Sequence, residues 1–463
     1  MSADTYCLNK DQAKLVANAS SIDMWKHLIV EADAGTGKTV ASAALINTLR
    51  GDASCAAITC CPTAVGAAEQ PDGFIPCKHK TAMRPLPACT VARLLTPGAQ
   101  TTIWDCLRDL AHQRKLALLH ILLDEYAMLN GVDFDKLLTC ARDALRGTVA
   151  KFRFVMLGDT KQLAAVDSSI LSTGAFASVL TTAACYTLSE TMRWSAADAD
   201  YTRLHKALVD KNAHVVGLML RELWVTPVRG CPTHGVTNTV YLAYANKVVD
   251  AINERAVDNI ACAQRRVYLL VAPKTSTVTR RLVQTGSVLG LQNRPKPDKQ
   301  HGYIFANKQV GTLINVTGDS TACEDAVRYG AGQRIQCLLL NKNLTALVEC
   351  ADGAIVELPA IREKTDTGIT YSLHLQHSYG RNTYAVQGQT IDRATKCVLD
   401  LNGLPDWHAL YVMLTRCRQF SQMIILPWDD SDGLDRLLHT SMPRGLDKFR
   451  RAFAHALAPP PVN

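Results

Sequence analysis

The residues best suited to chemistry stand in the decapeptide EADAGTGKTV, residues 31–40. Its two glycines permit a tight turn that aims backbone N–H groups at a bound phosphate from a helix N-terminus. Lys38 can reach the β- and γ-phosphates of a nucleotide, and Thr39 can ligate Mg²⁺. Ala32 stands where the usual pattern begins with glycine. The spacing predicts a loop for ATP that consists of Ala32, Asp33, Ala34, Gly35, Thr36, Gly37, Lys38 and Thr39.

Two further segments carry polar side chains directly after apolar runs. LLDEYAML places Asp124 and Glu125 there, and VMLGDTKQL places Gln162 there. Asp124 can hold Mg²⁺ through water, and Glu125 can orient and deprotonate an attacking water molecule. Gln162 could sense the γ-phosphate or that water. A small-molecule kinase does not need the water-activating carboxylate, so the pair favours an ATP hydrolase.

The elements that must position these residues are short, buried strands. Continuous apolar runs that end in small, polar or acidic residues are typical of parallel strands with chemistry at their carboxyl ends. We expect an α/β fold of two parallel-sheet domains in tandem. The first set of strands is expected at 27–32, 56–62, 118–125 and 152–159, and the second at 185–190, 239–246, 396–401 and 422–427.

Three other regions have a different pattern. Residues 262–370 contain short alternating runs between Gly, Asn and Pro, which predict a small β-rich insertion in the second domain. Residues 69–88 are rich in proline and predict an irregular surface loop. The tail at 456–463 is expected to fray.

The bulk composition is that of a globular protein and excludes a disordered chain. The chain has 463 residues, 48% of them apolar, and a formal net charge of +8, which fits a globular protein of several domains and permits a polyanionic partner. Sixteen cysteines occur without a Cys-x-x-Cys pair, so we expect reduced thiols and no zinc. Without an apolar signal core or a run of membrane-spanning length, we expect a soluble, intracellular protein.

Taken in order, the motifs resemble those of superfamily 1 helicases, in particular the Pif- and RecD-like branch. The last two segments are the most specific. The segments that carry the resemblance are LNKDQ (8–12), ADAGTGKT (32–39), CPTAVGAA (61–68), LLDEYAML (122–129), GDTKQL (158–163), LSETMR (188–193), AYANKVVDAIN (243–253), NKQVGTLINV (307–316), TYAVQGQTID (383–392) and YVMLTRCR (411–418).

The resemblance implies two RecA-like domains that face each other across one ATP. Residues 1–184 would form the first, residues 185–261 with 371–455 the second, and 262–370 an SH3-like insertion. The first would supply Lys38, Thr39, Asp124, Glu125 and Gln162, and Gln12 would read the adenine. The second would supply Gln387, Gly388 and two arginines, Arg193 and Arg416. An arginine finger is worth roughly 10³–10⁵ in rate in related NTPases.

The resemblance also implies contacts with a nucleic-acid strand. Hydroxyls and amides at strand ends would bind phosphates, and an aromatic ring would stack on a base. The residues at matching places are Thr63, Thr90, Asn246, Thr383, Tyr384 and Thr390. Tyr384 and Ala385 replace the usual histidine and lysine that couple the strand to ATP. From 265 to 310 nine basic residues accompany one acid, which favours a polyanion near the insertion.

From these residues and the resemblance we expect an ATP- and Mg²⁺-dependent DNA helicase that moves 5′ to 3′ on single-stranded DNA. Its partners would be single-stranded DNA, a duplex fork, and proteins of DNA replication, repair or recombination. Two alternatives stay open. One is an RNA helicase of the RNA-virus type, since the sequence does not display contacts to 2′-hydroxyls. The other is an ATPase switch that binds nucleic acid without unwinding it.

Overall fold

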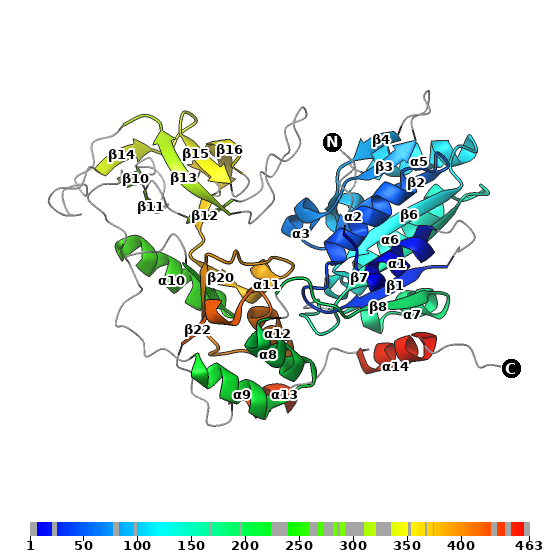
Figure 1. Ribbon diagram of the computed structural model, residues 1–463. Coiled ribbons are helices and arrows are strands. Elements are labelled where there is room, and N and C mark those ends of the chain that lie inside the picture. Colours follow the sequence, from blue (N-terminus) through cyan, green and yellow to red (C-terminus); the bar gives the residue numbers. More distant parts are fainter. Residues whose placement is uncertain are drawn as a thin grey trace.

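Two sheets with parallel strands and a β-rich insertion make up the described part of the chain (Figure 1). The computed structural model describes residues 7–20, 26–76, 83–96, 100–165, 168–194, 197–223, 239–259, 267–271, 281–284, 288–291, 310–320, 335–350, 353–365, 368–373, 375–426, 433–439 and 446–457.

The first domain is built on a sheet whose central strands are parallel and buried. In the described chain the strand order is β4-β3-β2-β6-β7-β1-β8, with β5 paired to β2. Every residue of β2 and β6 is buried, as expected for strands covered on both faces. The strands are β1 (Leu28–Ala32), β2 (Cys55–Cys61), β3 (Gly73–Pro76), β4 (Met83–Leu86), β5 (Cys89–Thr90), β6 (Leu118–Asp124), β7 (Lys151–Gly158) and β8 (Ala184–Leu188).

Helices cover both faces of this sheet. One face packs on α1 and α2, and the other packs on α5, α6, α7 and a helix from the far end of the chain, α14. These elements are α1 (Lys10–Ser20), α2 (Lys38–Leu49), α3 (Ala64–Glu69), α4 (Val91–Leu95), α5 (Gln100–His112), η1 (Tyr126–Met128), α6 (Gly131–Ala144), η2 (Ile170–Ser172), α7 (Gly174–Thr181) and α14 (Leu446–Leu457).

The second domain has a smaller parallel sheet, with the order β20-β9-β21-β22 among the residues described. Helix α12 is buried along its whole length and forms the centre of the domain core. The elements are α8 (Ala199–Val209), α9 (Ala213–Glu222), β9 (Thr239–Ala243), α10 (Asn246–Asn259), β20 (Gly380–Asn382), α11 (Thr383–Val386), β21 (Lys396–Leu399), α12 (Trp407–Leu414), η5 (Phe420–Gln422), β22 (Met423–Ile425) and α13 (Gly433–His439).

The β-rich insertion has its own apolar core. Its largest described sheet is antiparallel, with the order β16-β15-β13-β12-β19. The strands are β10 (Val267–Val271), β11 (Arg281–Gln284), β12 (Val288–Leu291), β13 (Val310–Thr317), β14 (Ile335–Leu339), β15 (Thr345–Cys350), β16 (Ile355–Pro359), β17 (Ile361–Thr365), β18 (Gly368–Ser372) and β19 (Leu375–His377). Almost all of the basic run at 265–310 lies outside the described residues.

Four sequence-based boundaries need correction. Residues 185–188 were expected in the second domain, but β8 pairs in parallel with β1 and so belongs to the first sheet. Residues 69–88 were expected to be an irregular loop, but β3 and β4 form an antiparallel pair at the edge of that sheet. The insertion was expected to end at 370, but β19 extends it to His377 through pairing with β12.

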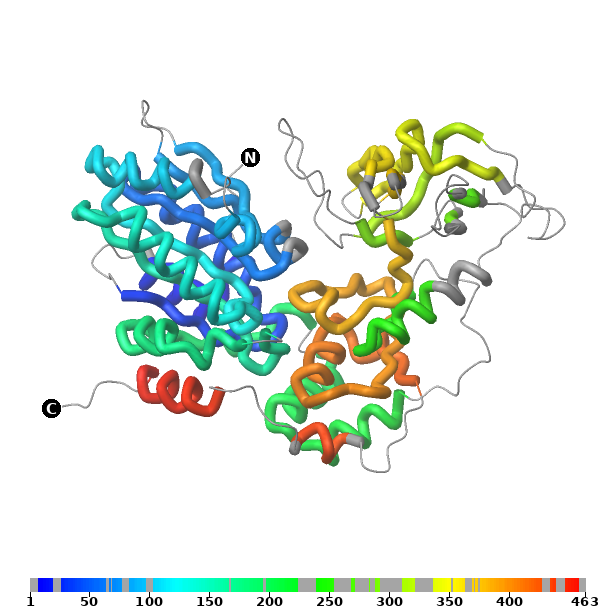
Figure 2. Tube along the Cα trace, turned by 180° about the vertical axis from the view of Figure 1, so that it is seen from behind, coloured from blue at the N-terminus to red at the C-terminus, as the bar shows by residue number. Residues whose placement is uncertain are grey.

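The fourth correction concerns the end of the described chain. Residues up to 455 were expected in the second domain, yet α14 packs on β8 and α7 of the first domain. Seen from behind, α14 lies beneath the first domain, whereas α13 lies in the second (Figure 2). Its apolar residues Leu446, Phe449 and Phe453 join the first-domain core. The predicted frayed tail was 456–463, but residues 456 and 457 are the last two of α14, and residues from 458 onward lie outside the described part of the chain.

Among the described helices, none combines the length and the apolar character that crossing a membrane requires.

Candidate nucleotide site between the two domains

The predicted phosphate-binding loop connects the carboxyl end of β1 to the N-terminus of α2. Gly35 (φ 82°) and Gly37 (φ 77°) take left-handed conformations that strain other residues. The Thr36 hydroxyl donates to the Asp33 carbonyl at 2.9 Å and closes the turn. A Cβ on Gly35 would lie only 2.6 Å from Cβ of Arg193, so this glycine also permits a close approach.

Ala32 does not disturb the loop. It is the last residue of β1 and pairs with Leu188 of β8, so its backbone is extended. Alanine adopts that conformation as readily as glycine does. The methyl group is buried in the sheet at 1% exposure. The turn therefore depends on the two later glycines and accepts alanine at its first position.

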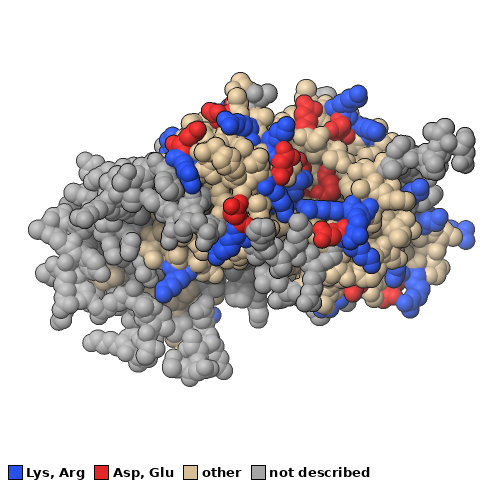
Figure 3. Space-filling view, turned by 90° about the horizontal axis from the view of Figure 1, so that it is seen from below, with Lys and Arg blue, Asp and Glu red and all other residues tan. Residues whose placement is uncertain are grey.

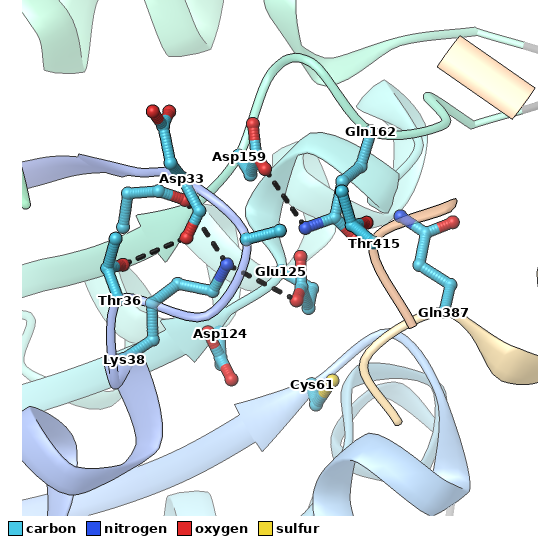
Figure 4. Close-up of polar contacts among 12 residues, drawn as sticks. Asp33, Thr36, Lys38, Cys61, Asp124, Glu125, Asp159, Gln162, Gln387 and Thr415 are labelled. Atoms are coloured by element: carbon cyan, nitrogen blue, oxygen red, sulfur yellow. Dashed lines mark hydrogen bonds and ion pairs between the residues drawn. The ribbon is translucent and has the colours of Figure 1, made fainter. Parts of the chain in front are cut away.

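Lys38 and Glu125 form an ion pair at the mouth of this loop (Figure 4). Nζ of Lys38 lies 3.6 Å from Oε1 of Glu125 and donates to the Ala32 carbonyl at 3.4 Å. Burial alone would lower the pKa of Lys38, but the charges of Glu125, Asp159 and Asp124 outweigh it and raise the pKa. Lys38 is therefore a cation held among carboxylates.

Asp124 and Glu125 end strand β6 beside the loop. Burial and the charge of Glu125 raise the pKa of Asp124. One oxygen of each carboxylate, Oδ1 of Asp124 and Oε2 of Glu125, is buried without a hydrogen-bond partner in the described structure. Oδ2 of Asp124 accepts a hydrogen bond from Nε2 of Gln70 at 2.6 Å. Two unsatisfied buried oxygens next to a lysine suit a bound cation and its water ligands.

Gln162 reaches the same space from the end of β7. Its Nε2 donates to Oδ2 of Asp159 at 3.1 Å, and its Oε1 is buried without a partner in the described structure. Asp159 is fully buried. In Figure 4 Gln162 lies beside Glu125, and Gln387 and Thr415 approach it from the second domain.

Two arginines approach Glu125 from the connection to the second domain and from that domain itself. Arg193 follows β8 and donates to the Thr415 carbonyl at 2.6 Å. Arg416 is 1% exposed and donates to the carbonyls of Val412 (2.9 Å) and Gln389 (3.1 Å). Within the described residues neither arginine has a carboxylate at ion-pair distance.

The electrostatics of the two arginines reflect this arrangement. Burial and the charge of Arg416 lower the pKa of Arg193 to about 10. Burial also lowers the pKa of Arg416, while the nearby charge of Glu125 acts in the opposite direction. Two cations without an anionic partner in a buried place are costly, and an anion between them would relieve that cost.

Gln387 and Gly388 lie on the second-domain side of the same space. Gln387 is 3% exposed, its Nε2 donates to the Leu163 carbonyl at 3.3 Å, and its Oε1 is buried without a partner in the described structure. Gly388 takes a left-handed conformation with φ 84°. This part of the second domain therefore contacts the first domain one residue after Gln162.

Gln12 lies against the phosphate-binding loop. It is fully buried, and its Nε2 donates to the carbonyls of Thr36 (2.9 Å) and Gly37 (3.4 Å). Its Oε1 accepts from the backbone N–H of Asn9 at 3.0 Å. The side chain thus fixes the backbone of the phosphate-binding loop through its carbonyl groups. Reading of adenine by Gln12 stays a prediction, and a base contact would have to share these bonds.

The residues fit Mg²⁺ and a nucleoside triphosphate. The loop presents a helix N-terminus and a lysine, Asp124 and Glu125 offer unsatisfied oxygens, and Arg193 and Arg416 lack an anion. Thr39, the expected metal ligand, is the second residue of α2 and lies next to Lys38. These groups come from both domains, so the site is complete only where the domains meet.

The expected nucleic-acid residues form two separate groups. In the first domain, Thr63 caps α3 by accepting from Gly66 N–H, and Thr90 caps α4 by accepting from Arg93 N–H. The two threonines are neighbours, because Cys61 and Thr90 pair in parallel strands. A hydroxyl that accepts a backbone bond still has its own O–H to donate to a phosphate.

In the second domain, Oδ1 of Asn246 accepts a hydrogen bond from Nδ2 of Asn382 at 2.6 Å. The bond is solvent-exposed and lies between the N-termini of α10 and α11. Thr383 follows but is fully buried, so its hydroxyl does not face solvent. The ring of Tyr384 lies 6.2 Å from that of Tyr244, and burial and Tyr244 raise its pKa to about 12.

Thr390 lies apart from both groups. Arg416 donates to the carbonyl of Gln389 and accepts at its own carbonyl from Ile391 N–H. The threonine between those two residues is therefore beside the arginine of the nucleotide site.

Sequence reasoning missed three residues that complete the site. Gln70 holds Asp124, Glu31 accepts from the Tyr126 hydroxyl at 2.7 Å beneath the loop, and Tyr411 crosses from α12 to the first domain. Tyr411 lay in a segment singled out for its arginine alone. Its role needs the packing of two domains, which no local pattern displays.

A second cleft of about 450 Å³ lies behind the nucleotide site, between α14, α12 and the turn after α8. Seen from below, Lys and Arg side chains surround a hollow with acidic side chains at its base (Figure 3). The residues that line the cleft include Glu31, Lys161, Lys211, Tyr411 and Arg450. It shares Tyr411 with the contacts between the domains.

Comparison with known proteins agrees with the sequence motifs. The model of a family described as AAA domain matches residues 7–227. A search among curated proteins finds none that matches. The structure is similar to the crystal structure of Pif1 helicase from Candida albicans, at 17% identity and a TM-score of 0.63, over 96% of this chain and 99% of that one.

Two structures of Pif1 from Bacteroides are also similar. The complex with ADP-AlF3 and single-stranded DNA matches at 16% identity and a TM-score of 0.63, over 97% of each chain. The unliganded form matches at 16% identity and a TM-score of 0.52, over 96% of this chain and 97% of that one. Residues 7–227 therefore match the AAA domain model, and the fold of the chain is similar to that of Pif1 helicases.

Proposed function

We propose that the protein is an ATP-dependent DNA helicase that requires Mg²⁺ and moves 5′ to 3′ on single-stranded DNA. The observation that carries the proposal is the pairing of Lys38 with Glu125 on one side and Arg193 and Arg416 on the other. A triphosphate placed between them would receive positive charge from both domains.

Residues of the first domain would bind the phosphates and activate the attacking water. Lys38 and the N–H groups at the start of α2 bind the phosphates. When Lys38 pairs with the phosphate, the carboxylate of Glu125 is released from its ion pair. That carboxylate then accepts a proton from the attacking water. Oε1 of Gln162, which has no other partner in the described structure, orients that water. Mg²⁺ near Asp124 and Thr39 would neutralise charge on the phosphates.

The arginines account for the dependence on the second domain. As charge develops on the γ-phosphate, Arg193 and Arg416 exchange carbonyl acceptors for phosphate oxygens. A phosphate oxygen carries negative charge that a carbonyl oxygen lacks, so the exchange adds Coulombic attraction and draws the domains together. Release of phosphate reverses it. The nucleotide would therefore set the distance between the domains.

Two groups of residues that could contact single-stranded DNA would turn this motion into movement along the DNA. Thr63 and Thr90 lie on the first domain, and Asn246 lies on the second. A strand held at both places would advance when the distance between them changes. Two Pif1 structures from Bacteroides that share this fold are bound to single-stranded DNA, which supports the choice of DNA. The 5′ to 3′ direction rests on the resemblance.

The test begins with Arg416→Ala. We expect the variant to bind a fluorescent ATP analogue within a few-fold of the wild type and to hydrolyse ATP on the order of 10³-fold more slowly. Arg416→Lys keeps the charge but loses the planar fork, and should recover only part of the rate. Arg146→Ala, which removes a highly exposed arginine from the first domain, serves as the control. Equal turnover by wild type and Arg416→Ala would refute the proposed site.

Substrate and direction need a second measurement. Matched DNA and RNA duplexes with either a 5′ or a 3′ tail are unwound in the presence of ATP. We expect displacement of the 5′-tailed DNA. Displacement of RNA alone would favour the RNA helicase, and hydrolysis stimulated by single strands with no displacement on any duplex would favour the switch.

A further inference from the structure

We propose that Tyr411 is a positioning residue that makes hydrolysis depend on contact between the domains, by fixing Gln162 through Asp159. The inference rests on the proposed ATP hydrolysis and adds a residue to it. Tyr411 belongs to α12 of the second domain, yet both described partners of its hydroxyl lie in the first.

The hydroxyl makes two hydrogen bonds with opposite polarity. It donates to Oδ2 of Asp159 at 3.0 Å and accepts from the backbone N–H of Ala34 at 3.1 Å. Ala34 belongs to the phosphate-binding loop, and Asp159 belongs to the segment that ends in Gln162. One atom of the second domain therefore joins two motifs of the first.

Asp159 passes this contact on to Gln162. Its Oδ2, which accepts from Tyr411, also accepts from Nε2 of Gln162 at 3.1 Å. Its Oδ1 accepts from Lys161 N–H at 2.9 Å and fixes the turn. With Nε2 held in this way, Oε1 of Gln162 is left as the acceptor that has no partner in the described structure. That orientation is the one needed to accept a hydrogen bond from water.

The same helix carries the arginine. Thr415 N–H donates to the Tyr411 carbonyl at 3.0 Å, and the Thr415 hydroxyl donates to that carbonyl at 2.8 Å. Arg416 follows directly and bonds Val412 of this helix at 2.9 Å. A movement of α12 toward the phosphates would therefore carry the arginine and the tyrosine together.

The burial of these groups makes the link costly to break. Tyr411 is 1% exposed and Asp159 is 0% exposed. Burial and the carboxylates of Asp159 and Asp33 raise the pKa of Tyr411, so its hydroxyl keeps the proton that it donates. If the domains separate, Asp159 and Ala34 N–H each lose a buried partner. Gln162 would then be held by one fewer constraint, and water would be poorly oriented.

Tyr411→Phe tests the inference, because it removes the hydroxyl and keeps the ring. We expect kcat for ATP in the presence of single-stranded DNA to fall about 10-fold, the effect of one to two hydrogen bonds. The KM for ATP and the affinity for a fluorescent ATP analogue should stay within about twofold, because the groups that bind the phosphates remain.

A double-mutant cycle separates positioning from packing. Gln162→Ala should itself reduce kcat, and Tyr411→Phe added to Gln162→Ala should reduce it by less than a further twofold. The control is Tyr268→Phe, which removes another buried hydroxyl, bonded to Asn315 at 2.5 Å in the insertion. It should leave kcat unchanged.

The outcomes are distinct. The inference is wrong if Tyr411→Phe keeps kcat within twofold of the wild type, or if its effect multiplies fully with that of Gln162→Ala. If the wild type hydrolyses ATP and Tyr411→Phe hydrolyses it equally well, this inference is wrong but the proposed function stands. A wild-type protein without hydrolysis overturns the proposed function as well.

Discussion

Replacing Glu31 by glutamine tests the electrostatics beneath the phosphate-binding loop. Glu31 lies on β1, and its carboxylate accepts from the Tyr126 hydroxyl at 2.7 Å and from the Thr160 hydroxyl at 3.3 Å. Burial and the charge of Asp159 raise its pKa from 4.5 to about 7, against the opposing effects of Tyr126 and Lys161. The folded protein thus holds a proton at Glu31 more tightly than the unfolded chain does.

The sign of the effect follows from this difference. Because the folded-state pKa is the higher one, the wild type loses stability as the pH rises from about 4.5 to about 7. The difference corresponds to about 3 kcal/mol, and most of it falls between pH 5 and pH 8. Glu31→Gln has no charge to bury. It loses an acceptor for the Thr160 N–H and hydroxyl, at a cost of about 1 kcal/mol at both pH values.

Calorimetry at pH 5 and pH 8 makes the comparison. We expect Glu31→Gln to melt below the wild type at pH 5 and above it at pH 8. A change of about 2–3 kcal/mol moves Tm by roughly 5–10 °C for a domain of this size. Glu357→Gln, at an exposed position in the insertion, changes the net charge equally and serves as the control. The same difference from the wild type at both pH values would refute the reasoning.

Two further substitutions test the packing around the site. Gly35→Ala should abolish binding of a fluorescent ATP analogue, since its Cβ would meet Arg193 at 2.6 Å and its φ is +82°; Gly147→Ala, at φ +74° with open space around it, should bind normally, and equal binding by both would contradict the crowding. Phe449→Ala should destabilise the first domain by about 3 kcal/mol in denaturant unfolding, because the ring is 3% exposed in its core. Leu457→Ala, on the same helix at 43% exposure, should cost far less, and equal losses would show that α14 does not dock as described.

The local sequence pattern predicted the strands and the turn that position the first-domain residues of the site. The apolar runs before Lys38, Asp124 and Gln162 are the largely buried strands β1, β6 and β7. Strand β6 ends at Asp124, and short turns after β1 and β7 lead to Lys38 and Gln162. The glycines that matter were also identifiable, because a left-handed turn before a helix has few other solutions. These features bring the first-domain residues of the candidate site together.

Long-range pairing was not predictable in the same way. Strand β8 has the sequence pattern of many short strands, and nothing within it specifies that it pairs with β1. The spacing of Leu446, Phe449 and Phe453 fits an amphipathic helix but does not identify the surface that it covers. Tyr411 is a further case, because its partners are more than 250 residues away in the sequence.

The return of α14 to the first domain has a mechanical consequence. The chain passes from the first domain to the second after β8 and comes back through residues 440–445, so two covalent connections join the domains. Seven peptide steps separate the end of α13 from the start of α14, and they span at most roughly 25 Å when fully extended. Two tethers of limited length suppress twisting and leave mainly rotation about the line between them. While α14 stays docked, each cycle of the proposed motor would follow the same arc, which a single flexible linker would not impose.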